Sequence, residues 1–157
     1  MPRAEQDNKI TQCILDRLMD ADARITAERQ LKASLRRDLE WLLNTRRIVD
    51  PPPESLVEVN RSLYTYGLPD FSSYSLNSPK DRSKLLRALE VTIAVFEPRL
   101  VGVKVTAIEA PTPGSRILRF QIEGLLLRDP APERVSFDTV LQLASGEYQV
   151  KGERSAG

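Results

Sequence analysis

Within FEPRLVGVKVTA, residues 96–107, the spacing of the apolar side chains changes from that of a helix to that of a strand, so this segment marks the transition from helices to sheet. Upstream, apolar residues recur every three or four positions as far as Phe96, which is the period of an α-helix. Pro98 pushes Glu97 out of the helical backbone region and therefore ends that helix. Downstream, residues 101–107 alternate apolar with smaller or polar side chains, which is the period of a β-strand.

Three further strands are predicted after this one. The alternation continues over residues 118–123, 135–141 and 148–150, and segments rich in proline or glycine separate these stretches. Ser145 and Gly146 close the last, tight hairpin. Short connections join antiparallel neighbours, and strict alternation indicates that one face is buried. The sequence therefore predicts an antiparallel four-stranded β-meander.

Two long helices are predicted before the sheet, over residues 26–45 and 78–96. The second begins with Ser78 as N-cap, Pro79 at the first helical position and Asp81 in the first turn. The apolar stripes are Leu31, Leu35, Leu39 and Leu42 in the first helix, and Leu85, Leu89, Ile93 and Phe96 in the second. Both stripes need cover, so we expect an α+β fold with both helices packed on one face of the meander.

The segment between the helices is predicted to be ordered rather than a flexible linker. Three prolines at 51–53 favour an extended path. The sequence YTYGLPDF, residues 64–71, then places glycine and proline beside three aromatic residues, which are suited to anchoring a loop.

Residues 1–25 are predicted to form an N-terminal arm, partly disordered or docked on a partner. Its apolar residues have helical spacing but make too short a helix to be stable alone in water. These residues are Ile10, Ile14, Leu15 and Leu18. We expect one α+β domain over residues 26–152 and a disordered tail over 153–157.

Composition excludes several classes of function. The 157-residue chain has no histidine, one cysteine and a net charge of +1. Without histidine, the usual serine or cysteine triads and nearly all zinc sites are excluded. A single cysteine forms no internal disulfide and fits a reducing compartment. We see no secretory signal and no membrane-length apolar run, so we expect a cytoplasmic protein.

No catalytic or cofactor-binding motif is evident. Carboxylates are plentiful, but none forms a pair that flanks an evident cleft, as glycoside hydrolysis requires. The glycines lie in strands or turns and form no phosphate-binding loop before a helix. The arginines at 36, 37, 46 and 47 are interpreted as a solvated helix face and helix terminus rather than a nucleic-acid site. We therefore predict no enzyme activity, no cofactor and no metal.

The triplet Glu97-Pro98-Arg99 is the most informative short motif. A glutamate at the C-terminus of a helix faces the negative end of the helix dipole and needs compensation. Arg99 is the nearest candidate for a bidentate pair with it. On these grounds a simple helix stop with a surface charge pair remains an equal alternative.

Trp41, in the first long helix, has two interpretations. We interpret it as a core or packing residue. The alternative is an exposed position at an interface, where tryptophan is enriched.

Four segments, read in order, resemble the TssE family of type VI secretion baseplate subunits. RDLEWLLNTR at 37–46 resembles the first-helix signature of that family, with Asp38, Glu40, Trp41, Asn44 and Arg46. ILDRL at 14–18 resembles its N-terminal segment, and YGLPD at 66–70 its central loop. EPRL at 97–100 matches the motif of the wider phage baseplate wedge family, often labelled lysozyme-like. The resemblance covers about residues 10–152.

This resemblance implies structural work in a contractile tail. Members of the family accompany the wedge proteins TssF and TssG, with TssK nearby, and are thought to template the first sheath ring of TssB and TssC. It implies assembly at the inner face of the cytoplasmic membrane through partners. The enzymatic label is historical and implies no activity.

A sheet edge of residues 100–150 is our candidate acceptor for sheath strands, because edge strands have unpaired backbone groups. Residues Glu97, Pro98 and Arg99 are expected to keep that edge rigid. The arm, with Ile10, Ile14, Leu15 and Leu18, is expected to dock on wedge partners. Two alternatives stay open: a carbohydrate-cleaving enzyme, and a regulatory adaptor built on the same fold.

Overall fold

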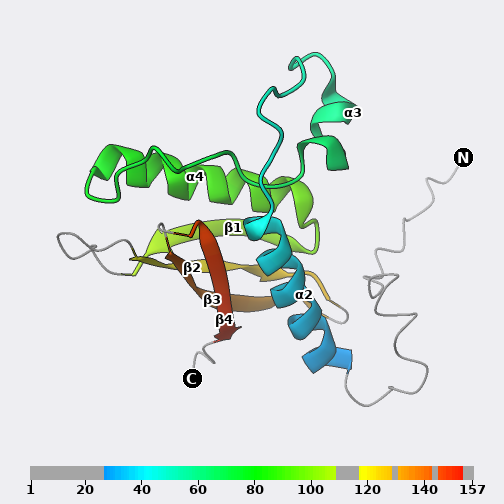
Figure 1. Cartoon of the computed structure of the whole chain (residues 1–157). Helices are drawn as coiled ribbons and strands as arrows, with labels where there is room; N and C mark the ends of the chain where they lie inside the picture. Colours follow the sequence, from blue (N-terminus) through cyan, green and yellow to red (C-terminus); the bar gives the residue numbers. More distant parts are fainter. Residues whose placement is uncertain (1–26, 109–116, 129–130, 143–144, 154–157) are drawn as a thin grey trace, which may run out of the picture.

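The computed structural model describes residues 27–108, 117–128, 131–142 and 145–153 (Figure 1). The helical elements are α2 (Ala27–Asn44), α3 (Val57–Asn60), a 3-10 turn (Leu63–Thr65) and α4 (Pro79–Phe96). The strands are β1 (Leu100–Ala107), β2 (Ile117–Leu126), β3 (Glu133–Gln142) and β4 (Glu147–Glu153). The N-terminal arm predicted from the sequence lies outside the described residues, and so does the predicted tail apart from Glu153, the last residue of β4.

The four strands form one antiparallel sheet in the order β1-β2-β3-β4. This order confirms the predicted four-stranded meander and, with the helices, the α+β class. Buried and more exposed residues alternate along β2 and β3, so one face of the sheet is covered. The register of β1 on β2 shifts between Val101 and Lys104, where Gly102 adopts a φ of +63°.

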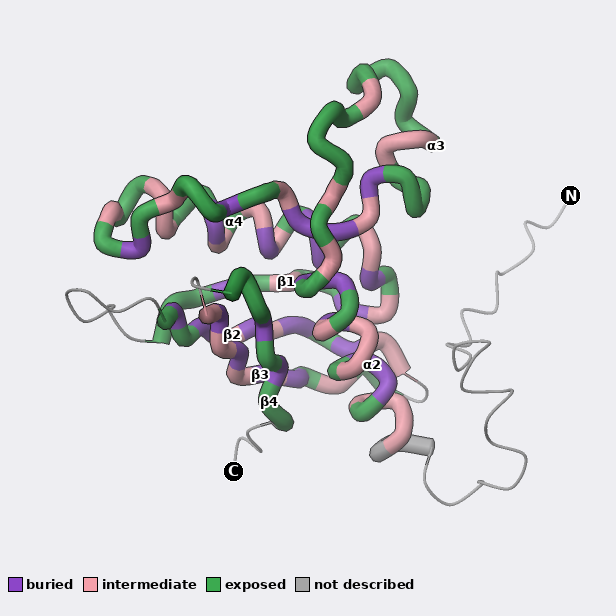
Figure 2. The backbone as a smooth tube through the Cα atoms, in the orientation of Figure 1, coloured by how far each residue is buried: buried purple, intermediate pink, exposed green. Residues whose placement is uncertain are grey.

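Both 18-residue helices, α2 and α4, contribute to the same core as the covered face of the sheet. In α4, the side chain of Ser78 accepts a hydrogen bond from the N–H of Asp81, and Pro79 occupies the first position, as predicted. Figure 2 shows the buried segments of the helices turned toward the strands. The largest fully buried side chains are Leu35, Leu39, Leu42, Leu43, Leu85, Leu89, Ile93, Leu118, Phe120, Ile122, Leu126 and Phe137.

The loop after α2 is held by a short parallel bridge between Arg46 and Leu68. The N–H of Arg47 donates to the carbonyl of Leu68, and the N–H of Leu68 donates to the carbonyl of Thr45, both at 2.8 Å. Gly67 adopts a φ of +108° beside this bridge. The loop is therefore ordered, as predicted.

Aromatic anchors hold part of this loop on the domain. The ring of Tyr66 meets that of Phe96 edge-on at 5.3 Å between centroids, and Phe71 meets Tyr74 in the same way at 5.1 Å. The third aromatic residue of the predicted set, Tyr64, is exposed and does not serve as an anchor. It lies in the 3-10 turn, whose only buried residue is Thr65.

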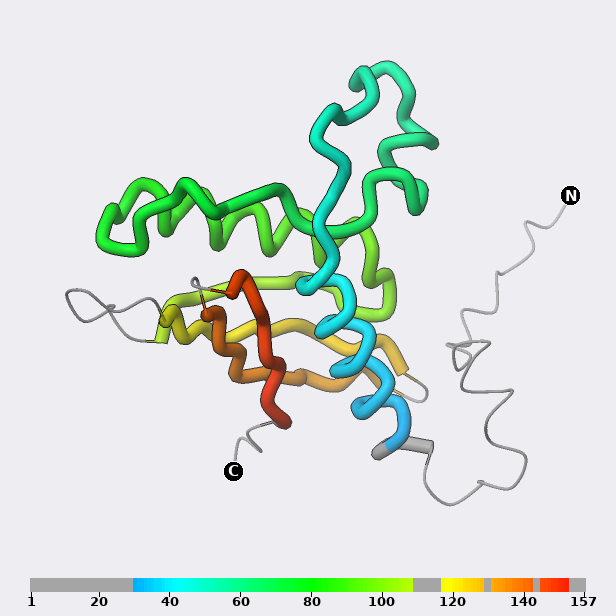
Figure 3. The backbone as a smooth tube through the Cα atoms, viewed as in Figure 1, coloured from blue at the N-terminus to red at the C-terminus, as the bar shows by residue number. Residues whose placement is uncertain are grey.

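The fold brings together the end of α2 and the start of β4, which are far apart in the sequence. Figure 3 shows the beginning of β4 beside the end of α2, although these segments are about a hundred positions apart in the sequence. Helix α4, which directly precedes β1 in the sequence, lies along β1 at the opposite end of the sheet from β4. Each outer strand of the meander therefore has a long helix as its neighbour.

Candidate functional site

A network of charged side chains links the end of α4 to the middle of α2. Arg99 donates through Nε and Nη2 to the two carboxylate oxygens of Glu97, both at 2.6 Å. Its Nη2 also donates to Asp38 at 2.7 Å, and its Nη1 lies 3.4 Å from Oγ of Ser34. One guanidinium thus joins Glu97 to Asp38, a residue 61 positions away from Arg99 in the sequence.

This network is largely shielded from water. The side chain of Glu97 is 6% exposed and that of Arg99 is 15% exposed. Glu97 caps the C-terminus of α4, where the helix dipole disfavours a negative charge. The bidentate contact from Arg99 supplies the compensation that the sequence predicted. The surface-pair alternative is wrong for Glu97, because its side chain is buried.

Helix α2 supplies the second carboxylate. Asp38 accepts hydrogen bonds through Oδ1 from Nε and Nη2 of Arg37, at 3.1 and 3.0 Å. The guanidinium carbon of Arg37 lies 5.0 Å from the ring centroid of Trp41, which places a cation over the indole. Trp41 is 53% exposed, so its interpretation as a core residue was wrong. Its position falls outside the buried leucine stripe of α2 and therefore faces away from the sheet.

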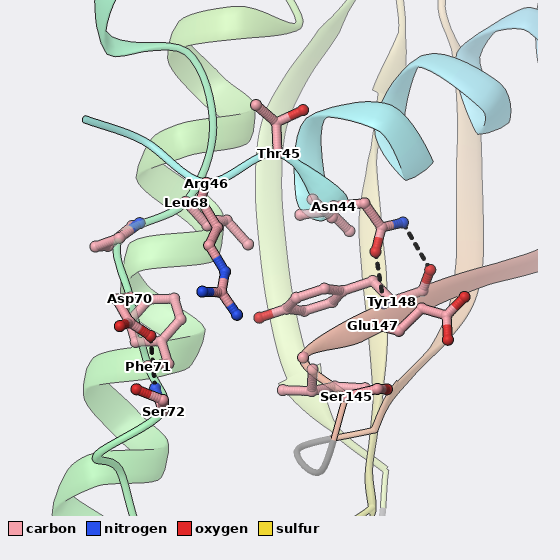
Figure 4. Close-up of a pocket in the computed structure, with 14 residues that line it drawn as sticks. Asn44, Thr45, Arg46, Leu68, Asp70, Phe71, Ser72, Ser145, Glu147 and Tyr148 are labelled. Atoms are coloured by element: carbon pink, nitrogen blue, oxygen red, sulfur yellow. Dashed lines mark hydrogen bonds between the residues drawn. The ribbon is translucent and has the colours of Figure 1, made fainter. Parts of the chain in front are cut away.

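The side-chain amide of Asn44 occupies the outer edge of β4. Its Oδ1 accepts from the N–H of Tyr148, and its Nδ2 donates to the carbonyl of Tyr148, both at 2.8 Å (Figure 4). Nδ2 also donates to the carbonyl of Glu40, at the end of α2. Backbone groups of a strand alternate between its two neighbours, so those of Tyr148 face away from β3. Asn44 therefore stands in for a paired strand at one residue.

Glu90 of α4 makes a similar contact at the opposite edge of the sheet. The N–H of Val105 in β1 donates to Oε1 of Glu90 at 3.0 Å. The other carboxylate oxygen, Oε2, accepts from Nη1 of Arg87 at 3.2 Å. Glu90 holds one backbone group at this edge, whereas Asn44 holds two at the edge of β4.

A pocket of about 380 Å³ opens beside the Asn44 cap (Figure 4). Figure 4 shows the guanidinium of Arg46 extending between Asp70 and the hydroxyl end of Tyr148. The N–H of Ser72 donates to Asp70 at 2.9 Å, and this bond is the main reason that the pKa of Asp70 is lowered. The charges of Arg46 and Asp70 are opposite, and Glu147 adds a second carboxylate, so the ionisable side chains that line the pocket have a net charge of −1.

Burial of Tyr148 predicts a loss of stability at alkaline pH. Desolvation raises the pKa of its phenol, whereas an unfolded tyrosine titrates near pH 10. The stabilisation is therefore complete below pH 10 and is lost as pH rises toward the folded-state pKa. The free energy of unfolding should fall between pH 9 and pH 11 in both proteins, and we expect the fall to be about 1.4 kcal/mol smaller in Tyr148→Phe than in the wild type. Urea denaturation at both pH values measures this difference, and identical losses would contradict the prediction.

The comparisons with known proteins identify the family. A family model described as baseplate wedge protein gp25 matches residues 29–131, which is more than half of the chain. The chain belongs to this gp25 family of baseplate wedge proteins. The match spans both long helices and the Glu97-Pro98-Arg99 corner, and it confirms the resemblance stated from the sequence. The comparison with curated proteins returned no match.

Family membership gives this baseplate wedge protein a structural role in a phage-like contractile tail, in contact with other baseplate proteins. Among the described residues, no cluster of three or more potential metal ligands is present. None of the described helices is both long enough and apolar enough to cross a membrane.

The structure brings together only part of the residue set predicted for the site. Asp38 joins the Glu97–Arg99 pair, whereas Asn44 and Arg46 lie at the edge of β4 and Trp41 lies on the surface. The contribution of Glu40 to the cap is its backbone carbonyl. Sequence reasoning did not single out Ser34 or Tyr148, because both lie within ordinary helix and strand patterns. It considered Glu90 only as one of several carboxylates.

Proposed function

We propose that this baseplate wedge protein is the TssE-like structural subunit of a type VI secretion apparatus. In this proposal it binds TssF and TssG, with TssK nearby, and nucleates the TssB–TssC sheath by accepting a strand at one sheet edge. The assembly lies in the cytoplasm, held by its partners at the inner face of the cytoplasmic membrane. The proposal rests on the gp25 family match, together with outer strands that pair with no further strand among the described residues.

The edge of β1 is the better acceptor of a sheath strand. The N–H of Val105 in β1 is bound by the side chain of Glu90, and moving that one flexible side chain releases it. The N–H of Ile108 bonds inward to the carbonyl of Arg119, so the N–H of the preceding Ala107 faces outward, away from β2. Most of β1 is solvent-exposed. A strand added here would gain main-chain hydrogen bonds at the cost of the Glu90 contact and of part of the packing of α4 along β1.

The edge of β4 is closed more completely. Asn44 uses a donor and an acceptor on the same residue, Tyr148, and both bonds would have to break. Farther along β4, a Cβ added at Gly152 would lie 3.9 Å from Nη1 of Arg36. Helix α2 therefore runs beside β4 along most of the length of that strand. Opening this edge requires displacing part of a core helix.

The charged corner supports the β1 edge. The backbone carbonyl of Arg99 accepts from the N–H of Leu127 at 2.8 Å, which fastens the start of β1 to the end of β2. The side chain of Arg99 fastens the same residue to Glu97 and to α2. A pre-formed edge lowers the ordering cost of binding. We assign the Glu97-Pro98-Arg99 motif this positioning role in sheath assembly.

The N-terminal arm is assigned to the wedge partners. Its apolar residues, Ile10, Ile14, Leu15 and Leu18, lie outside the described residues, and their spacing predicts a helix that needs a partner surface. Docking on TssF and TssG supplies that surface.

The carbohydrate-cleaving alternative has little support from the geometry. Asp38 and Glu97 line one pocket of about 300 Å³, but Arg99 binds both carboxylates there. A glycosidase needs one carboxylic acid that holds its proton as the general acid. Here both carboxylates are instead engaged in ion pairs with the guanidinium of Arg99. No observation favours the regulatory adaptor over the baseplate subunit.

One experiment tests the two parts of this proposal. We expect the Ala107→Pro variant to bind purified TssF–TssG normally but to form few fluorescent TssB–TssC sheaths in cells, because proline removes the outward N–H of β1. Asn44→Ala is the matched control at the β4 edge and should form sheaths at normal frequency. Removing residues 1–24 should instead reduce co-purification with TssF–TssG.

Contrary outcomes are distinct for each part. Normal sheath formation by the folded Ala107→Pro variant would exclude β1 as the acceptor edge. Loss of sheaths in a folded Asn44→Ala variant would point to β4. Failure of the wild-type chain to bind TssF–TssG at all would overturn the type VI assignment.

A further inference from the structure

A groove beside α4 has a strongly one-sided charge. It measures about 630 Å³ and is bordered by α4 on one side and by the segment that follows α2 on the other. Its cationic members are Arg47, Lys84 and Arg87, and its lining includes no carboxylate. We call this the basic groove; its other lining residues are Pro69, Tyr74, Ser83, Ala88, Val91 and Thr92.

The cations of the basic groove are poorly satisfied within the chain. Nε of Arg47 is buried and has no hydrogen-bond acceptor among the described residues. A buried guanidinium donor without an acceptor costs free energy, which an acceptor from outside can recover. Lys84 is exposed at the rim of the groove. Arg87 contacts Glu90 at 3.2 Å, but its side chain is 77% exposed, so this pair is weak.

Apolar surface lies next to these charges. Val91 lines the groove and is 49% exposed, and Val95, one turn farther along α4, is also exposed. Tyr74 and Ala88 add partly buried apolar surface. Exposed valines on a helix contribute binding energy only when a partner removes them from water.

The chemistry of the groove selects one class of occupant. Nucleic acid is disfavoured, because the chain as a whole has a net charge of only +1 and the groove brings together just three cations. A peptide that carries a carboxylate next to an apolar side chain matches both features at once. The carboxylate would meet Arg47 and Lys84, and the apolar side chain would cover Val91 and Tyr74.

We propose that the basic groove binds an acidic segment, flanked by apolar residues, of another baseplate polypeptide. This inference deepens the proposed function and rests on it, because it assigns a wedge-binding surface to α4, separate from the strand-accepting edge of β1. The groove orients the protein on its wedge partner, and the edge of β1 stays free for the sheath.

Charge reversal in the groove tests this inference with purified TssF–TssG as the probe. We expect Lys84→Glu/Arg87→Glu in the full chain to bind the probe at least about tenfold more weakly than the wild type. Wild-type affinity should fall between 50 and 500 mM salt, and the variant should lose this dependence. The charge-matched control, Arg61→Glu/Lys80→Glu, changes exposed residues that do not line the groove and should bind like the wild type.

Each outcome of this experiment is informative. Equal affinity and equal salt dependence for the groove variant and the wild type would overturn the inference, whereas no wild-type binding would reject the proposed function itself. A synthetic peptide of residues 8–24, which contains Asp16, Asp20 and Asp22 beside the arm's apolar residues, is assayed in parallel. If reversal abolishes binding of this peptide but not of TssF–TssG, the occupant is the chain's own arm and the proposal is wrong.

Discussion

Arg99→Ala is expected to lower the free energy of unfolding by about 3–5 kcal/mol, because it leaves buried charge without a partner. Glu97, nearly fully buried, would lose both of its 2.6 Å bonds and remain at the negative end of the α4 dipole. Asp38 would lose its 2.7 Å bond at the same time and keep only Arg37. The link between α2 and the start of β1 would be lost.

Urea denaturation at pH 7 measures this effect. Arg99→Lys should recover only part of the loss, because an ammonium group lacks the bidentate fork that binds Glu97. Arg87→Ala removes the exposed pair with Glu90 and serves as the control, with an expected change below about 0.5 kcal/mol. A loss in Arg99→Ala no greater than in this control would show that the network contributes little to stability.

The Arg99→Lys variant also separates folding from assembly. If it is folded at the growth temperature, its sheath frequency reports on the positioning role of the corner rather than on protein abundance. Normal sheath frequency in a folded variant whose corner is loosened would remove the positioning role that we assign to the Glu97-Pro98-Arg99 motif.

Gly67→Ala is expected to destabilise the protein by about 3 kcal/mol or more, through backbone strain combined with a steric clash. Gly67 has a φ of +108°, a region that residues with a Cβ rarely adopt. A Cβ built there would clash with the backbone carbonyl oxygen of Thr45, and the carbonyl carbon would lie only 2.8 Å away. That oxygen accepts the bridging hydrogen bond from Leu68, so the bridge would have to open.

Gly102→Ala provides a matched control for this substitution. Gly102 also has a positive φ, +63°, but a Cβ there would meet nothing within 4 Å. Its expected cost is therefore that of the left-handed backbone alone, roughly 1–2 kcal/mol. Thermal and urea denaturation of both variants compares the two costs. Equal losses would mean that the close approach to Thr45 relaxes without consequence.

The site was predictable only where its partners are neighbours in the sequence. Glu97 and Arg99 are two positions apart, so the helix dipole argument was enough to pair them. Asp38, the third member of the network, was singled out as part of a family signature and not as a partner of Arg99, and its contact with Arg99 spans 61 positions. Local patterns contain no information on which helix face meets which corner, because the packing of α2 on the sheet decides that contact.

Trp41 is a second residue whose position could not be predicted from local sequence. Its size and apolar character favour burial, and that interpretation failed because the leucine stripe at 35, 39, 42 and 43 had already determined which face of α2 is inward. The cap on Tyr148 was also invisible in the sequence. Asn44 is a common helix-ending residue, and nothing local indicates that its amide would bond a strand about a hundred positions away.

Local sequence patterns were enough to predict the order of the long helices and strands, the α+β class and the helix-to-strand corner at Pro98. These features depend on periodicity, capping and proline stereochemistry, which act over a few neighbouring residues. Tertiary structure alone decided that Arg99 bridges two elements, that Asn44 and Glu90 hold the two sheet edges unequally, and that Arg47, Lys84 and Arg87 share one groove. Such contacts depend on how α2 and α4 pack over the sheet, and that packing is set by the whole core rather than by any one segment.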